Sequence, residues 1–285
     1  MRKPALLARC KSDSYISAKV EGGRRTQGNP RKVSGEQPLL TIITVVLNGE
    51  ATLEDTLRSI IEQTYRNIEH IVIDGGSTDA TLAILSKYQN NIDYWVSEKD
   101  AGIYDAMNKG ITFSTGDYIG MLNADDRFAS PVALEKIVLR LMESKADAVF
   151  SCLDIIEAGC PARIMRKYRV SRLSPSLLRI GVMPPHPTFY CKRSCYVQSG
   201  LYKTDYRISA DFEMMVRLRI VQNISWEFID EVTVIMRSGG LSSSGFRARI
   251  TLNREIVRAC RENGLYTNVL LLALKLPIRL IELMR

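Results

Sequence analysis

Short apolar runs alternate with amphipathic segments between residues 39 and 152, and this alternation constrains the fold more than any other feature. The first run, residues 39–47, reads LLTIITVVL and is rich in β-branched residues, which is typical of a strand buried on both faces of a sheet. Further strands are expected over 68–73, 92–96, 118–122 and 146–152, with helices between them. Strands that alternate with helices build βαβ units. The sequence therefore predicts an α/β fold, one domain with a mostly parallel central sheet flanked by helices.

The chain outside residues 39–152 has a different hydrophobic pattern. Residues 1–37 show little periodic apolar content and are expected to be a disordered basic tail. Beyond residue 153 we expect hairpins and loops over 153–208, a helix over 211–220, strands over 226–229 and 232–236, and terminal helices over 247–263 and 265–284. The predicted organisation is a tail over 1–37, a central domain over 38–246, and basic amphipathic helices over 247–285.

The net charge of +8 is concentrated at the two ends of the chain. Residues 1–37 hold nine Lys and Arg against three Asp and Glu, and residues 247–285 hold eight against three, so the middle carries a net charge of −3. A mildly acidic central domain argues against nucleic-acid binding, whereas basic ends suit an anionic membrane surface. The six cysteines and two histidines show no zinc-binding pattern. Because no apolar stretch reaches the roughly 20 residues that span a bilayer, and no signal peptide is seen, we expect a cytoplasmic protein.

Acidic residues follow three successive predicted strands. Asp74 ends the second strand, Asp100 follows the third, and Asp125 and Asp126 follow the fourth. The carboxyl ends of parallel strands meet at one edge of a sheet, where ligands bind. Crowded carboxylates are unfavourable unless a cation or hydrogen-bond donors lie among them. One acid at a strand end would be an ordinary turn residue, but three in succession indicate a ligand site.

The tetrapeptide Asn123-Ala124-Asp125-Asp126 is the sharpest signal of this kind. Two adjacent carboxylates after a buried strand can hold Mg²⁺ or Mn²⁺ through oxygen ligands, and such ions with few protein ligands usually bridge substrate phosphates. This predicts a diphosphate-bearing substrate; a surface Asp-Asp turn is the alternative. Residues 74–79, DGGSTD, form neither a Walker loop nor a Gly-x-Gly-x-x-Gly motif, which disfavours nicotinamide binding.

Several of these motifs, in this order, resemble a known family. The run TIITVVLNGEATLEDTLRSIIEQTYRNIEHIVIDGGSTDAT is similar to the opening of family 2 glycosyltransferases, which have the GT-A fold. The run EKDAGIYDAMNKGITFSTGDYIGMLNADD is similar to bacterial polysaccharide and glycolipid transferases of the colanic-acid type, and PHPTFY and ISADFEMMVRL continue the likeness. The resemblance covers about residues 40–236. It implies a nucleoside-diphosphate sugar as donor and Mg²⁺ or Mn²⁺ as cofactor.

The resemblance also implies roles for individual residues. The residues implied to line the nucleotide pocket are Thr44, Val46, Asn48 and Glu50. Asp74 is implied to hydrogen-bond the nucleotide base, Asp125 to lie near the ribose or sugar, and Asp126 to bind the metal. Asn123 departs from a full Asp-x-Asp motif, so metal ligation rests mainly on Asp126.

Two further groups complete the implied site. Asp211 matches the catalytic-base position, with Glu213 as the nearby alternative. His186 is implied to lie at the site, although a buried histidine is often only a hydrogen-bonded core residue. Residues 100–110 are expected to border the donor sugar, where Asp100, Tyr104 and Asn108 could hydrogen-bond hydroxyls; alternatively, Tyr104 and Asn108 cap and pack their helix.

These observations predict an inverting glycosyltransferase that moves a hexose to a glycan or lipid-linked acceptor. The alternative is a catalytically weak nucleotide-sugar-binding or scaffold subunit of a glycan-assembly complex. A nucleotidyltransferase is disfavoured, because no Gly-rich basic loop follows the first strand. The C-terminal apolar and basic stretch predicts a peripheral contact with the inner face of the plasma membrane, or else packing on the domain or on a second subunit.

Overall fold

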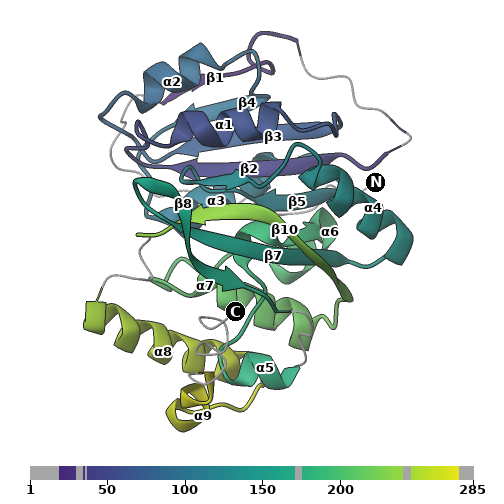
Figure 1. Ribbon diagram of the computed structural model, residues 1–285, viewed down its shortest axis with the longest axis vertical. Coiled ribbons are helices and arrows are strands. Elements are labelled where there is room, and N and C mark those ends of the chain that lie inside the picture. Colours follow the sequence, from purple (N-terminus) through teal and green to yellow (C-terminus); the bar gives the residue numbers. More distant parts are fainter. Residues whose placement is uncertain (1–18, 30–34, 36, 171–174, 240–244, 276–285) are drawn as a thin grey trace.

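The computed structural model describes residues 19–29, 35, 37–170, 175–239 and 245–275. In these residues one ten-stranded sheet has the order β1-β4-β3-β2-β5-β9-β7-β10-β6, with β8 paired to β7 off this path (Figure 1). The strands are β1 Val20–Gly22, β2 Leu40–Val46, β3 Ile68–Asp74, β4 Tyr94–Ser97, β5 Tyr118–Met121, β6 Asp126–Phe128, β7 Ala148–Glu157, β8 Cys160–Tyr168, β9 Tyr190–Lys192 and β10 Trp226–Arg237.

Helices cover both faces of this sheet (Figure 1). The α-helices are α1 Leu53–Ile61, α2 Thr81–Lys87, α3 Ile103–Phe113, α4 Ala133–Ser144, α5 Pro175–Arg179, α6 Arg193–Ser199, α7 Ala210–Val216, α8 Gly245–Glu262 and α9 Val269–Ala273. A 3-10 helix, η2, spans His186–Thr188, and a π-helix, η3, spans Arg217–Val221.

The first half of the sheet has the parallel order that the sequence predicts. Strands β4, β3, β2 and β5 run parallel, and all seven residues of both β2 and β3 are buried. Alternate residues of β2 face opposite layers: Ile43 and Val45 pack on the α3 side, whereas Leu40 and Ile42 pack on the α4 side. This two-sided burial explains why the strand reads as a continuous apolar run.

The second half of the sheet is mixed rather than mostly parallel. Strand β9 runs antiparallel to both β5 and β7, and β6 runs antiparallel to β10, while β7 and β10 are parallel. The expected hairpin after residue 153 is present as β7 and β8. The two strands expected over 226–236 are one strand, β10, whose register shifts between Ile229 and Val232 because a bulge takes up the intervening acidic residues.

The ends of the chain differ in part from expectation. Residues 20–22 form β1, which pairs antiparallel with β4, and the Arg24 and Arg25 N–H groups donate to the carbonyls of Ile92 and Asp93 at 3.0 and 2.9 Å. Part of the expected tail is therefore ordered, because it completes the open edge of β4. Residues 1–18, 30–34 and 36 lie outside the described residues.

The C-terminal segment forms α8 and α9. The helix expected over 265–284 is described only as α9, and residues 276–284 lie outside the described part of the chain. The buried side of α8, with Ile256, Ala259 and Cys260, joins the same core as α3 and α7. Within the described residues, no helix has the length and apolar character needed to cross a membrane.

Candidate active site

Asp74 organises the turn at the end of β3. It is fully buried, and its Oδ2 accepts hydrogen bonds from Gly76 N at 3.2 Å, Ser77 N at 3.0 Å and Ser97 Oγ at 2.6 Å. Its Oδ1 accepts from the Ser77 hydroxyl. These bonds join the ends of β3 and β4, so the structure places Asp74 at the expected sheet edge as the acceptor that holds the turn.

The loops after β2 and β3 are joined by two of the predicted pocket residues. Asn48, at a positive φ of 52°, accepts at Oδ1 from Thr78 N at 2.9 Å. Glu50 accepts at Oε2 from Ala80 N at 3.0 Å. These bonds fix the shape of the rim beside Asp74.

Thr44 and Val46, by contrast, do not lie on the rim. Thr44 is fully buried, and its hydroxyl shares a hydrogen bond of 3.1 Å with His70 Nε2. Val46 is buried in the core with Leu53 and Leu57 of α1. The structure therefore places these two predicted pocket residues inside the domain rather than on an open surface.

Asp100 lies against the turn that follows Asp74. A Cβ added to Gly75 would stand 2.5 Å from Asp100 Oδ2, so only glycine fits this approach without displacing the carboxylate. Asp100 also accepts from Gly102 N at 2.9 Å through Oδ1. The tertiary structure thus brings the β3 and β4 turns into direct contact.

Asp126 is an unsatisfied buried carboxylate at the start of β6. It is 1% exposed, and neither of its oxygens has a hydrogen-bond partner within the structure. Burial raises the pKa of this carboxyl well above its ordinary value, and the neighbouring Asp125 adds to the rise. The Asn123 Oδ1 is a second buried oxygen without a partner. Such groups are rare in folded proteins unless a ligand or ion satisfies them, so this oxygen-lined position fits a divalent cation.

Few carboxylates converge around Asp126. Among the residues that the structure describes, no three His, Cys, Asp or Glu side chains form a metal-binding group. Asp125 has a pKa raised mainly by burial and lowered in part by Arg237. A cation here would need non-protein oxygens to complete its coordination, and diphosphate oxygens are the usual source.

A second cluster of ionisable groups lies at the start of α7. Asp211 Oδ1 accepts from Phe212 N at 2.8 Å and faces Tyr104 Oη at 3.4 Å. Burial raises the pKa of Asp211, and His186 opposes that rise. Burial also lowers the pKa of His186, whose Nε2 lies 2.9 Å from Tyr202 Oη. A neutral His186 can accept this bond, so the cluster pairs a carboxylate of raised pKa with an uncharged imidazole.

The Asn108 amide packs α3 against a neighbouring loop. Its Nδ2 donates to the Tyr202 carbonyl at 2.9 Å, and its Oδ1 accepts from Tyr202 N at 2.8 Å. Of the two roles that the sequence left open, the structure gives Asn108 the packing role. Tyr104 also packs α3 against a neighbouring loop, since its hydroxyl donates to the carbonyl of Ile208, and it lies 3.4 Å from Asp211 Oδ1.

Two residues of this region were not predicted from the sequence. Tyr202 connects Asn108 to His186, and its ring stacks on Tyr104 with centroids 6.0 Å apart. Arg237 ends β10 one residue beyond Met236, which pairs with Asp126, and its guanidinium bonds Asp55. Neither residue belongs to a local sequence motif. Their places at the site follow from contacts between residues far apart in the chain, which the sequence does not record.

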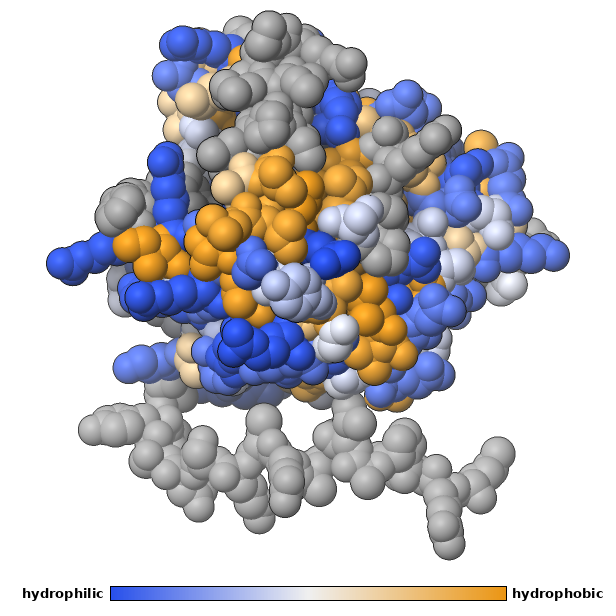
Figure 2. All heavy atoms as spheres, turned by 90° about the horizontal axis from the view of Figure 1, so that it is seen from below, coloured by the Kyte–Doolittle hydropathy of each residue, from blue (hydrophilic) through white to orange (hydrophobic). Residues whose placement is uncertain are grey.

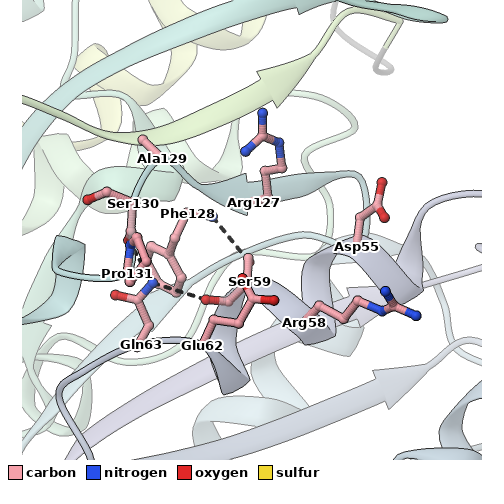
Figure 3. A pocket seen from close by; sticks show the side chains of 10 residues that line it. All are labelled: Asp55, Arg58, Ser59, Glu62, Gln63, Arg127, Phe128, Ala129, Ser130 and Pro131. Carbon is pink, nitrogen blue, oxygen red and sulfur yellow. Dashed lines mark hydrogen bonds between the residues drawn. The ribbon is translucent and has the colours of Figure 1, made fainter.

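One cavity formed by the described residues lies away from these side chains. It has a volume of about 360 Å³ between α1 and residues 127–131, with Arg58, Ser59 and Gln63 on one side and Phe128 and Pro131 on the other (Figure 3). Its lining contains none of the predicted site residues. The cavity therefore carries no part of the candidate site.

The described residues form a GT-A-like α/β fold with acidic residues at one edge of the sheet, and comparisons with known proteins identify the family. The sequence profile described as glycosyl transferase family 2 matches residues 41–199, more than half of the chain. The chain therefore belongs to glycosyltransferase family 2.

Two curated relatives come from mycobacteria. An uncharacterized glycosyltransferase of Mycobacterium tuberculosis (strain H37Rv) is 33% identical over 199 residues, covering 65% of this chain and 70% of the relative. A PGL/p-HBAD biosynthesis glycosyltransferase of Mycobacterium bovis (strain BCG) is 30% identical over 184 residues, covering 63% and 69%.

Solved structures share the fold. S. aureus TarS 1–349 in complex with UDP-GlcNAc superposes with a TM-score of 0.63 at 16% identity, covering 80% of this chain and 68% of that one. In the longer TarS structure the chain covers 40% of the molecule. The mannosyltransferase PcManGT from Pyrobaculum calidifontis, in complex with GDP-Man and Mn²⁺, gives a TM-score of 0.59 at 19% identity, covering 84% and 68%. At these identities the likeness establishes a GT-A-like α/β fold.

Proposed function

We propose that this family 2 glycosyltransferase moves a hexose, with inversion, from a nucleoside-diphosphate sugar to a glycan or lipid-linked acceptor in polysaccharide or glycolipid biosynthesis. The observation that carries the proposal is the buried Asp126 carboxylate, both of whose oxygens lack a partner at the sheet edge where ligands bind. The named complexes of UDP-GlcNAc with TarS and of GDP-Man with PcManGT support a nucleotide-sugar donor. The colanic-acid type stays a prediction.

Asp126 is the residue proposed to hold Mg²⁺ or Mn²⁺, with Asp125 and Asn123 beside it. Such an ion would neutralise charge on the departing diphosphate. A bound cation would favour the ionised form of this buried carboxyl, and in a site of low dielectric the attraction between the two charges is strong. The Asp74 turn and Asp100 are proposed to bind the nucleotide and the donor sugar, on the rim that Asn48 and Glu50 hold in shape.

Asp211 is proposed to take the proton from the acceptor hydroxyl as it attacks. A general base contributes roughly 10²–10⁴-fold, and its efficiency improves as its pKa approaches the working pH. The raised pKa of Asp211 serves this role. Because Asp211 begins α7 rather than ending a parallel strand, it can act from the side opposite the leaving group, which gives a single inverting displacement.

The lower face of the molecule suits a membrane-borne acceptor. Figure 2 shows apolar side chains gathered on this face, with hydrophilic side chains around them. Helix α9, at the bottom of Figure 1, and the residues flanking it carry exposed apolar side chains, Tyr266, Val269, Leu270 and Leu274, and Leu270 is 82% exposed. Helix α8, which contacts α9, carries Arg247, Arg249, Arg254 and Arg261 along its length. Apolar residues flanked by arginine are suited to the interface of an anionic membrane, so we propose peripheral contact at the inner leaflet.

Calorimetry of donor binding tests the proposal. We would titrate UDP, GDP and dTDP, with and without Mn²⁺, into the wild-type chain and Asp126→Asn, using Glu143→Gln as the charge-removing control because Glu143 is an exposed carboxylate of α4. Metal-dependent binding of one nucleotide that is lost only in Asp126→Asn would support the proposal. The nucleotide-sugar of that base would then be assayed for transfer, with the anomeric configuration of the product read by NMR. No binding of any nucleotide by folded protein would refute it.

A further inference from the structure

The segment that leads into Asp211 is held by a carboxylate from another helix. Glu255, on α8, accepts at Oε1 from Arg207 N at 2.7 Å, and at Oε2 from Ile208 N and Ser209 N, both at 2.9 Å. Three consecutive backbone donors thus share one acceptor group. Hydrogen bonds to an ionised acceptor are stronger than neutral ones, so this contact fixes the backbone two residues before Asp211.

The same segment is held from the opposite direction by α3. The Ile208 carbonyl accepts from the Tyr104 hydroxyl, and the Ile208 N–H donates to Glu255. The two backbone polar groups of Ile208 are therefore bonded to different helices. The Asp211 carboxylate itself accepts one bond from its neighbour Phe212 and a long one from Tyr104, so its position depends on the backbone that carries it.

Other contacts between α8 and this region use side chains only. Glu262 accepts from Tyr206 Oη at 2.9 Å and from Lys203 Nζ at 2.8 Å. Arg258 bonds Asp205. These contacts hold α8 in place without touching the backbone over 207–209. Glu255 differs from these neighbours on α8 because it binds backbone N–H groups rather than side chains.

We propose that Glu255 is a positioning residue for the reaction, which orders residues 207–209 and thereby sets the place and burial of the Asp211 carboxylate. The inference rests on the function proposed above, in which Asp211 is the base. It gives α8, which lies beyond the residues matched by the family profile, a direct part in turnover.

The test compares Glu255→Ala and Glu255→Gln with Glu262→Gln, a matched change on the same helix. Displacement of a catalytic group by about 1 Å can reduce turnover roughly 10²-fold. We expect Glu255→Ala to reduce kcat roughly 10- to 100-fold, with the donor KM and the calorimetric donor affinity within about twofold of wild type. Glu255→Gln should lose less, since its amide oxygen can still accept two of the three bonds. Backbone amides 207–209 should exchange faster with deuterium in both variants, and Glu262→Gln should match wild type in every measurement.

Other results would overturn the inference. If Glu255→Ala keeps wild-type kcat while Asp211→Asn abolishes transfer, Glu255 has no positioning role and the proposed function stands. If Glu262→Gln loses as much kcat as Glu255→Gln, the effect belongs to α8 packing in general and the inference fails. Should Glu255→Ala not fold, Glu255→Gln supplies the same comparison. If Asp211→Asn is fully active, Asp211 is not the base, and the positioning role proposed for Glu255 fails with it. The amide exchange then reports only whether Glu255 orders residues 207–209.

Discussion

Replacing Asp126 with Asn should stabilise the metal-free protein while removing its response to metal and diphosphate. The wild-type carboxylate is 1% exposed and both oxygens lack partners. Because burial raises the pKa of Asp126, folding near neutral pH either buries an unpaired charge or forces the carboxyl to take up a proton, and either costs several kcal/mol, whereas an unpaired neutral amide costs about 1–3 kcal/mol. We therefore expect Asp126→Asn to be about 1–3 kcal/mol more stable in EDTA. For a domain of roughly this size that corresponds to a Tm increase of about 2–12 °C.

The order of stability should reverse when ligands are added. At a nucleotide concentration 100 times its Kd, with saturating Mn²⁺, binding stabilises the wild-type chain by about 2.7 kcal/mol, and the variant gains none of this. Thermal unfolding in EDTA and in Mn²⁺ with the nucleoside diphosphate measures both effects. Glu143→Gln, on an exposed carboxylate of α4, should leave both Tm values close to wild type. A variant less stable than wild type in EDTA, or one that keeps the full ligand-induced shift, would refute the reasoning.

Three further results are expected. Asp211→Asn should reduce kcat roughly 10²–10⁴-fold with donor binding intact. In the wild type, burial raises the pKa of Asp211, so activity should fall as the pH drops through a pKa above the ordinary aspartate range. A pH–rate profile whose acidic inflection lies at the ordinary aspartate pKa would contradict this. Gly75→Ala places a Cβ 2.5 Å from Asp100 Oδ2, so the donor KM should rise with little change in kcat, and an unchanged KM would remove Asp100 from the donor site. Leu270→Glu should weaken sedimentation with anionic vesicles, whereas Leu139→Glu, at an exposed leucine of α4, should not; equal loss in both would argue against the lower face.

Hydrophobic pattern alone predicted the elements of the first half of the chain. Continuous apolar runs identified β2 and β3 because both faces of these strands are buried, and such burial leaves a local signature in the sequence. The pattern did not reveal that β9 inserts antiparallel between β5 and β7, nor that residues 20–22 pair with β4. Strand pairing joins residues distant in the chain, and no local period records the partner.

The candidate site divides in the same way. The sequence by itself determined which acidic residues end the parallel strands, and the order of its motifs indicated the family, because the residue types and spacings that bind a nucleotide sugar lie in short runs. Only the tertiary structure decided that Asp126 is buried without a partner, that Asn108 packs against Tyr202, and that Glu255 holds the segment before Asp211. Burial and hydrogen bonding depend on what the rest of the fold brings alongside a residue, and that is set by packing between elements tens of residues apart.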